Sequence, residues 1–300
     1  MREYFKDQNL SIVNKLYRED IFVQDFSKNI DGSQPKTSTV NNEYIKFDNI
    51  ELDDYGKIDS KFSYPSITES ICSSVLRHSN IPNKIRCANY YFGIYMDNDM
   101  NDKYGCSSFS ISENYRQNFE NEYILASPYG SGQASNSIMR TDDYRDEIFE
   151  TLRPKESQNI IIDSIMKKFK NYDRIKLEDQ FVNKCAIDIL FGNKDIRNNP
   201  GNFIIVCNEN ENSQPDIVSM DYGRCIHFGE SNTYMSKNEI INNIYFKPYE
   251  ININEIKNEC KQMKIRIRDN IKLCSFIDIT YDRLINNLNK NKELWIDISN

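Results

Sequence analysis

Two aspartates with an asparagine between them provide the side chains that phosphoryl transfer requires. Asp195 and Asn202 lie in a polar loop after an apolar helical segment, and Asp221 directly follows the short apolar run 216–220. In phosphoryl transfer one aspartate orients the attacking hydroxyl, while an asparagine and a second aspartate hold the magnesium ion that neutralises developing charge. The order therefore predicts an ATP-dependent phosphotransferase in which Asp195 is catalytic and Asn202 and Asp221 bind Mg²⁺.

Other asparagines compete for the metal role in the same loop. Asn198 and Asn199 are alternatives to Asn202, which is preferred because it directly precedes the apolar strand expected over residues 203–206. Taken singly, these polar residues make an ordinary turn. Their order and their flanking strands favour the metal site, and Gly223 is expected to let the chain turn sharply behind Asp221.

A second segment, residues 31–39, could hold phosphate groups. Gly32, Ser33 and Gln34 offer exposed backbone amides that can cradle a phosphate, and Lys36 adds positive charge. The segment contains no Walker A or G-x-G-x-x-G pattern, so a plain solvated loop is the simpler interpretation of these residues alone.

A lysine on a strand and a glutamate on the following helix are candidates for an ion pair near the phosphates. Lys46 alternates with Ile45 and Phe47, so it lies on the opposite face of its strand from both. If that face lines a cleft, Lys46 would contact the α- and β-phosphates of ATP and pair with Glu69. Lys61 is the alternative lysine, and capping of its own helix is the alternative role of Glu69. The backbone around Ser107 and Phe109 would bind adenine, or is an ordinary strand.

Together these segments resemble the HipA-like serine/threonine kinases over residues 27–225. The run Gly32–Lys36 resembles that family's G-x-Q-x-K phosphate loop. Lys46 resembles the family's ATP-binding lysine, and Glu69 resembles the glutamate that pairs with it. Asp195 matches the catalytic aspartate, and Asn202 and Asp221 match the two metal ligands.

The chain also departs from the family pattern. The spacing from Asp195 to Asn202 is longer than usual, and Asp221-Tyr222-Gly223 stands in place of Asp-Phe-Gly. Asn29 occupies the position of the serine that the toxins of this family autophosphorylate, with Ser27 and Ser33 close by. The chain is most similar to compact members without an extra N-terminal subdomain.

The resemblance implies an ATP- and Mg²⁺-dependent serine/threonine protein kinase that acts on a protein hydroxyl. It further implies a toxin or effector capable of autophosphorylation, with an antitoxin or other regulatory protein as its partner. A phosphatidylinositol-type lipid kinase or small-molecule kinase shares the same residue order. A nucleotide-binding pseudokinase is a third interpretation, because the loop from Asp195 to Asn202 is lengthened.

Composition excludes several other classes. The net charge of −7 over 300 residues argues against binding along a nucleic-acid backbone. No apolar run is long enough for a membrane span, and the charged residues 1–7 do not read as a secretory signal, so we expect a cytoplasmic protein, with export as an effector left open. Eight scattered cysteines indicate reduced thiols, and the two histidines, His78 and His227, are expected to be structural or exposed.

The pattern of apolar residues predicts the elements that position these groups in the first part of the chain. We expect a helix over 9–24, a loop over 27–43, a strand over 43–47 and a helix over 66–76. Ser66 and Glu69 form a capping-box pattern at the start of that second helix. Two strands, 87–96 and 104–111, are expected to be joined by a turn at 97–99.

Residues after about 115 are expected to be mainly helical. Helices are predicted over 160–169, 181–190 and much of 252–295, with strands at 203–206 and 216–220 around a hairpin loop. The predicted fold class is therefore α+β, a two-lobed protein-kinase-like fold. Its β-rich N-lobe would span residues 1–112, and its mainly α-helical C-lobe would span residues 113–300.

Overall fold

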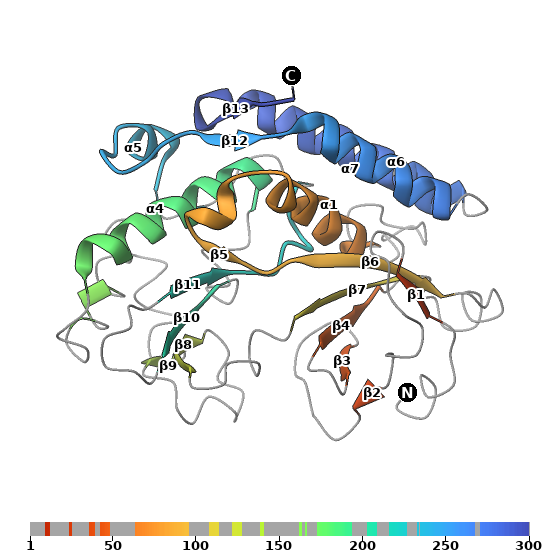
Figure 1. The fold of residues 1–300 in the computed structure, drawn as a ribbon, viewed down its shortest axis with the longest axis horizontal. Helices are drawn as coiled ribbons and strands as arrows, with labels where there is room; N and C mark the ends of the chain where they lie inside the picture. Colours follow the sequence, from red (N-terminus) through yellow and green to blue (C-terminus); the bar gives the residue numbers. More distant parts are fainter. Residues whose placement is uncertain are drawn as a thin grey trace, which may run out of the picture.

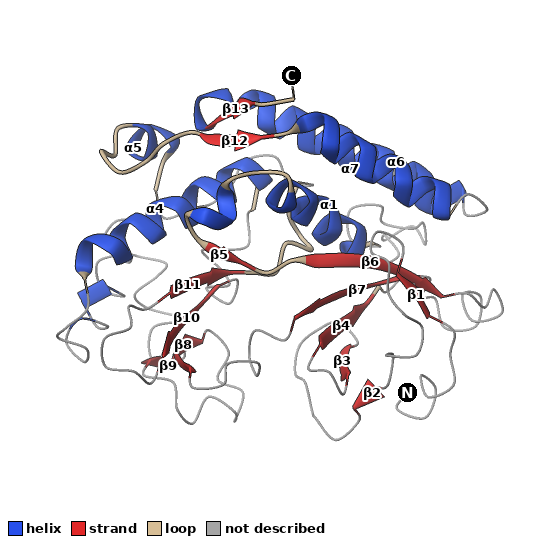
Figure 2. Ribbon diagram, viewed as in Figure 1, coloured by secondary structure: helices blue, strands red, loops and turns tan. Residues whose placement is uncertain are grey.

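A computed structural model shows a mixed α+β fold. The residues that it describes are 10–12, 24–25, 36–39, 43–48, 64–95, 108–113, 122–127, 139–140, 162–163, 166, 173–193, 203–208, 216–226, 233, 235–267 and 271–299. Figure 1 traces the chain through these elements, and Figure 2 separates the helices from the strands.

One sheet has six strands, all antiparallel, in the order β1-β6-β7-β4-β3-β2. Its central pairing joins β4 to β7, so the strand that carries Lys46 lies inside the sheet. The strands are β1 (Leu10–Ile12), β2 (Gln24–Asp25), β3 (Lys36–Thr39), β4 (Glu43–Phe47), β6 (Tyr90–Tyr95) and β7 (Ser108–Glu113).

A second sheet has five strands in the order β5-β11-β10-β8-β9. Its first strand comes from the region before residue 112 and pairs parallel with β11, so this sheet crosses the boundary predicted at residues 112 and 113. The strands are β5 (Arg86–Cys87), β8 (Glu122–Ser127), β9 (Met139–Arg140), β10 (Phe203–Asn208) and β11 (Asp216–Ser219).

Helices cover one side of both sheets, as Figures 1 and 2 show. Helix α1 (Pro65–Arg77) lies over β6 and β7, and α4 (Arg174–Phe191) lies over β11. The long helices α6 (Ile253–Arg266) and α7 (Ile271–Lys290) pack outside α1. The remaining elements are α5 (Lys237–Ile241), the 3₁₀ turns Ile81–Asn83 and Lys292–Leu294, and the parallel pair β12 (Tyr249–Ile251) and β13 (Trp295–Asp297).

Helix α1 is buried on all sides because it lies between the sheet and the outer helices. Its apolar stripe of Ile67, Ile71 and Val75 repeats every four residues, as an α-helix requires. Pro65 occupies the first turn, where no intrahelical N–H bond is lost. The capping box expected from Ser66 and Glu69 is wrong: the N-cap is Tyr64, with no side-chain cap.

Helix α4 has the end signals that its sequence provides. The Asp173 side chain accepts hydrogen bonds from the N–H groups of Ile175 and Lys176, which satisfies two donors of the first turn. Gly192 ends the helix in the left-handed conformation with φ 61°, a backbone that glycine adopts without a Cβ penalty. The helix predicted over 181–190 is therefore confirmed and begins earlier than expected.

Several other expectations fail within the described residues. The helix expected over 9–24 is wrong at residues 10–12, where Leu10 and Ile12 alternate as in a strand and pair with β6. Part of the loop expected over 27–43 is the strand β3, and β8 and β9 lie where helix was expected. Of the helix expected over 160–169, only residues 162, 163 and 166 fall within the described part and are helical.

Six cysteines have described side chains; all six are free thiols, and five of them are buried. In the stretches that the structure describes, no helix is long and apolar enough to cross a membrane.

Candidate functional site

Lys46, the last residue but one of β4, contacts two carboxylates from distant parts of the chain. Its Nζ atom lies 2.5 Å from Glu69 Oε1 and 2.8 Å from Asp221 Oδ1. Only 9% of the lysine side chain is exposed to solvent. A buried ammonium group is costly unless it is paired and hydrogen-bonded, and here the two carboxylates satisfy it.

Glu69 reaches this point from the first half of α1. Its second carboxylate oxygen accepts a hydrogen bond from Ser110 Oγ on β7 at 2.5 Å. Burial raises the pKa of Glu69, and the nearby charge of Lys46 opposes that rise while Asp221 adds to it. Helix α1 and strand β4 are thus tied together by a buried, charge-assisted bond.

Asp221 stands just beyond β11 and, unlike Glu69, is open to water. Its side chain is 46% exposed. Its backbone has φ 62°, a left-handed conformation that non-glycine residues rarely adopt and that is typical of functional sites. Its N–H donates a hydrogen bond to the hydroxyl of Tyr90 at 3.2 Å.

Gly223 has a different role from the one that the sequence suggested. The left-handed residue in this turn is Asp221, and Gly223 has no positive φ. A Cβ atom on Gly223 would lie 3.0 Å from the Cβ of Pro65 and 3.5 Å from Oε1 of Glu69. The absence of a side chain therefore lets the segment after β11 approach the start of α1.

A second buried carboxylate, that of Asp48, lies near the Lys46–Glu69 pair. Asp48 accepts hydrogen bonds from the N–H of Ser66 at 2.9 Å, from Ser108 Oγ at 2.5 Å and from Ser66 Oγ. Burial raises its pKa to about 7, although these donors favour the charged form. Asp48 connects the end of β4 to the first turn of α1 and to β7.

The arrangement suits a magnesium–phosphate ligand. Lys46 brings one positive charge to two carboxylates, so the cluster with Asp221 and Glu69 carries excess negative charge beside solvent. Mg²⁺ is usually bound through one or two carboxylates together with substrate phosphates, and Asp221 supplies such a carboxylate. Within the described ranges, no group of three or more His, Cys, Asp or Glu side chains could hold a metal by itself.

The structure brings together three of the residues that the sequence singled out: Lys46, Glu69 and Asp221. Lys36 on β3 lies opposite Lys46 in the strand register, and Phe109 on β7 lies opposite Phe47. The remaining predicted site residues lie outside the described residues: Gly32, Ser33, Gln34, Ser107, Asp195 and Asn202.

Sequence reasoning missed Asp48, Ser110 and Tyr90. A signal for two of them exists in the strand period, because Asp48 follows Lys46 by two residues and so points to the same face. On β7 the serines at 108, 110 and 112 also alternate, and all three are buried. Tyr90 gives no such signal, because nothing in the sequence distinguishes it from the other tyrosines among the 19 in the chain.

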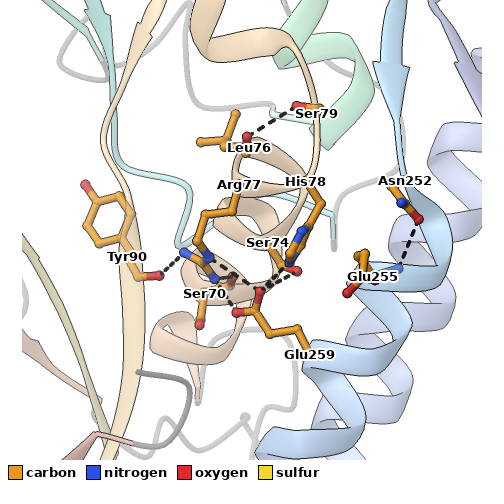
Figure 3. A network of polar contacts seen from close by, with 10 residues as sticks. All are labelled: Ser70, Ser74, Leu76, Arg77, His78, Ser79, Tyr90, Asn252, Glu255 and Glu259. Atoms are coloured by element: carbon orange, nitrogen blue, oxygen red, sulfur yellow. Dashed lines mark hydrogen bonds and ion pairs between the residues drawn. The ribbon is translucent and has the colours of Figure 1, made fainter. Parts of the chain in front are cut away.

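His78 has a structural role, as expected. Its Nε2 atom lies 3.1 Å from a carboxylate oxygen of Glu259 on α6, away from Lys46. Figure 3 shows this contact between the end of α1 and α6. His227 lies outside the described residues.

Comparison with known proteins places the chain near few others. No family model matches it, and no curated protein sequence matches it. A crystal structure of the Helicobacter pylori proinflammatory kinase CtkA is similar at 13% identity, over 92% of this chain and 94% of that chain, with a TM-score of 0.45.

Proposed function

We propose that this protein is an ATP- and Mg²⁺-dependent phosphotransferase, a serine/threonine protein kinase of HipA-like type. The observation that carries the proposal is the contact of Lys46 with both Glu69 and Asp221. Lys46 and Asp221 are 175 residues apart in the chain. Kinases require a lysine–glutamate ion pair and a metal-binding aspartate beside it.

The three residues differ in exposure in the way that this role needs. Glu69 is enclosed and fixed by Ser110, so it acts as an anchor for the Lys46 side chain. Asp221 is half exposed and is therefore accessible to a metal ion from solution. With ATP and Mg²⁺ bound, Lys46 would hold phosphate oxygens and Asp221 would hold the metal ion, while Mg²⁺ would neutralise charge on the phosphates.

Asp195 and Asn202 complete the proposed machinery from the sequence. Asp195 would orient the hydroxyl of the protein substrate, and Asn202 would be the second metal ligand, with Asn198 and Asn199 as alternatives. Helix α4 ends at Phe191 with its C-cap at Gly192, so Asp195 follows the defined end of a helix by four residues in the sequence. Autophosphorylation and a regulatory partner such as an antitoxin remain part of the proposal.

The test is transfer of labelled phosphate from γ-labelled ATP with Mg²⁺, followed by mass spectrometry of the modified residues. Asp221→Asn should reduce transfer at least about 100-fold, because it removes one preorganised group at the reacting phosphate. Asp195→Ala should do the same. The matched control is Asp216→Asn, the same change at the start of β11, where the carboxylate accepts a hydrogen bond from Gln180.

Four results would contradict the proposal or parts of it. Equal transfer by wild type and Asp221→Asn would remove the metal assignment. Nucleotide binding without transfer to any protein, peptide or lipid would indicate a pseudokinase, and label on phosphoinositides would indicate a lipid kinase. Absence of both transfer and nucleotide binding would overturn the kinase assignment.

A further inference from the structure

Tyr90, the first residue of β6, touches two residues of the proposed site. Its hydroxyl accepts the hydrogen bond from the N–H of Asp221 at 3.2 Å. Its ring lies 5.2 Å from Lys46 Nζ, a distance at which an ammonium group is attracted to an aromatic face. The residue is 3% exposed, so its hydroxyl is enclosed beside the main chain of Asp221.

The main chain of Tyr90 is fixed by helix α1. Its N–H donates a hydrogen bond to Ser73 Oγ at 2.8 Å, and its carbonyl oxygen accepts one from Arg77 Nη1 at 3.0 Å. Ser73 lies four residues after Glu69, so both side chains project from the same face of α1. That face therefore contacts Tyr90 through Ser73 and Lys46 through Glu69. The start of β6 cannot move relative to α1 without breaking these two hydrogen bonds.

Arg77 is held in turn by the outer helix α6. Glu259 pairs with Arg77 and also accepts a hydrogen bond from Ser74 Oγ at 3.1 Å. Figure 3 shows Arg77 between the Tyr90 carbonyl and the Glu259 carboxylate. The guanidinium also lies 4.6 Å from the ring of Tyr91. The start of β6 is thus held by α1 and, through Arg77, by α6.

The Asp221 backbone needs such support. A left-handed φ is strained for a residue with a Cβ, and it persists only where the surroundings enforce it. The next residue is also held, because the Tyr222 ring packs edge-on against Tyr90 at 5.9 Å and against Phe191 at 5.3 Å. The turn after β11 is therefore positioned by Tyr90 from both its hydroxyl and its ring.

We propose that Tyr90 is a positioning residue, whose hydroxyl holds the main chain of Asp221 in the left-handed conformation that directs its carboxylate to Lys46 and the metal ion. Its catalytic consequence rests on the proposed kinase function. The structural part, control of the Asp221 backbone, does not.

The test compares Tyr90→Phe with Tyr249→Phe. Tyr249 is fully buried and its hydroxyl bonds to Asn183 at 2.8 Å, so its variant also loses a buried phenol hydroxyl without altering the turn after β11. The first measurement is amide hydrogen exchange at Asp221, followed by NMR on protein labelled with ¹⁵N-aspartate, without nucleotide. Tyr90→Phe should exchange at least tenfold faster at Asp221, and Tyr249→Phe should not.

The second measurement is Mn²⁺ binding with a non-hydrolysable ATP analogue, followed by electron paramagnetic resonance. Tyr90→Phe should weaken Mn²⁺ binding about tenfold, a change typical of losing an outer-shell partner of a metal ligand, and should lower kcat more than it raises KM for ATP. Tyr249→Phe should lower the melting temperature only.

The outcomes separate the two proposals. Unchanged exchange at Asp221 in Tyr90→Phe overturns the positioning role, whatever the wild type does with nucleotide. Faster exchange together with a wild type that binds no nucleotide supports the hold on Asp221 and overturns the kinase function. Faster exchange with unchanged Mn²⁺ binding and kcat overturns the link between this hold and the metal site.

Discussion

Two buried lysine–carboxylate pairs in this protein have similar chemistry and different surroundings. Lys184 and Asp188 lie one turn apart on α4, each 1% exposed, with Nζ 2.6 Å from Oδ1. The pair Lys46–Glu69 joins two separate elements and has a third member, Asp221, that is 46% exposed. The pair on α4 is closed, whereas the cluster at Lys46 has one side open to solvent.

The difference shows how a structural ion pair can be told from a candidate site. Asp188 also accepts a hydrogen bond from Asn193, which lies two residues after the end of α4. The polar partners of this pair therefore all come from the helix and the residues that end it. Burial raises the pKa of Asp188 to about 6 although Lys184 favours the charged form. In the Lys46 cluster the carboxylate of Asp221 stays accessible to solvent, as a group that binds a ligand must be.

The largest expected effect comes from breaking the closed pair. Lys184→Met should destabilise the protein by about 3–5 kcal/mol, because it leaves a buried carboxylate without its partner. The double variant Lys184→Met/Asp188→Leu should recover most of this loss, since apolar residues of similar volume can replace a buried pair. Urea unfolding followed by circular dichroism measures both changes.

The matched pair of variants at the site is Lys46→Met and Lys46→Met/Glu69→Leu. Both should lack phosphate transfer, and the double change should not restore it, because the lysine would be required for phosphate contact. If the double variant at Lys46 regained transfer, or if Lys184→Met lost transfer without losing stability, the distinction between the two pairs would be wrong.

A smaller effect is expected where the two chain segments of the site approach each other. Gly223→Ala should cost about 1–3 kcal/mol, because the new Cβ would overlap the Pro65 side chain at 3.0 Å. A double-mutant cycle on unfolding free energy measures the contact. Coupling should appear with Pro65→Gly, which removes the opposing Cβ, and should be absent with Pro65→Ala, which keeps it. Coupling of equal size in both cycles would assign the cost to something other than this contact.

A pH dependence of stability is expected from Asp48. Since burial raises its pKa from 3.8 to about 7, the folded state holds a proton that the unfolded state releases between these values. Its contribution to stability therefore falls as the pH rises from about 4 to about 7, by at most about 1.4 kcal/mol per pH unit. Asp48→Asn cannot ionise, so it should gain stability relative to wild type across this window.

Unfolding free energies at several pH values measure that difference. Asp282→Asn, at an exposed position of α7, is the control and should follow wild type. A constant difference between Asp48→Asn and wild type from pH 4 to pH 7 would show that Asp48 is equally protonated in the folded and unfolded states.

The sequence was sufficient for the elements with strong periodicity. The stripe of Ile67, Ile71 and Val75 predicted α1, and the alternation around Lys46 predicted β4 and placed the lysine opposite Ile45 and Phe47. The short strands were harder, because β2, β5 and β9 have two residues each, too few to show a period of two. In addition, β5 pairs with β11, which lies more than 100 residues later in the chain.

For the site, residue types could be predicted from the sequence, but the surroundings of those residues could not. Ser66 and Glu69 fitted a capping box, yet Asp48 takes the Ser66 N–H and Lys46 takes the Glu69 carboxylate. Local pattern could not reveal either partner, because both lie on β4 or just after it rather than on the helix. The roles assigned to Asp195 and Asn202 stay predictions.

The segment from Arg86 to Tyr95 has a consequence for how the protein folds. It contributes β5 to one sheet and, three residues later, β6 to the other, with Ala88 between them bonded to the carbonyl of Ser219 at 2.8 Å. The pairing of β5 with β11 must wait for a chain closure of well over 100 residues. Such non-local pairing slows folding. Because a single continuous stretch belongs to both sheets, a fragment cut after β7 would lack the partner of β5, and we expect the two sheets to form and unfold as one cooperative unit.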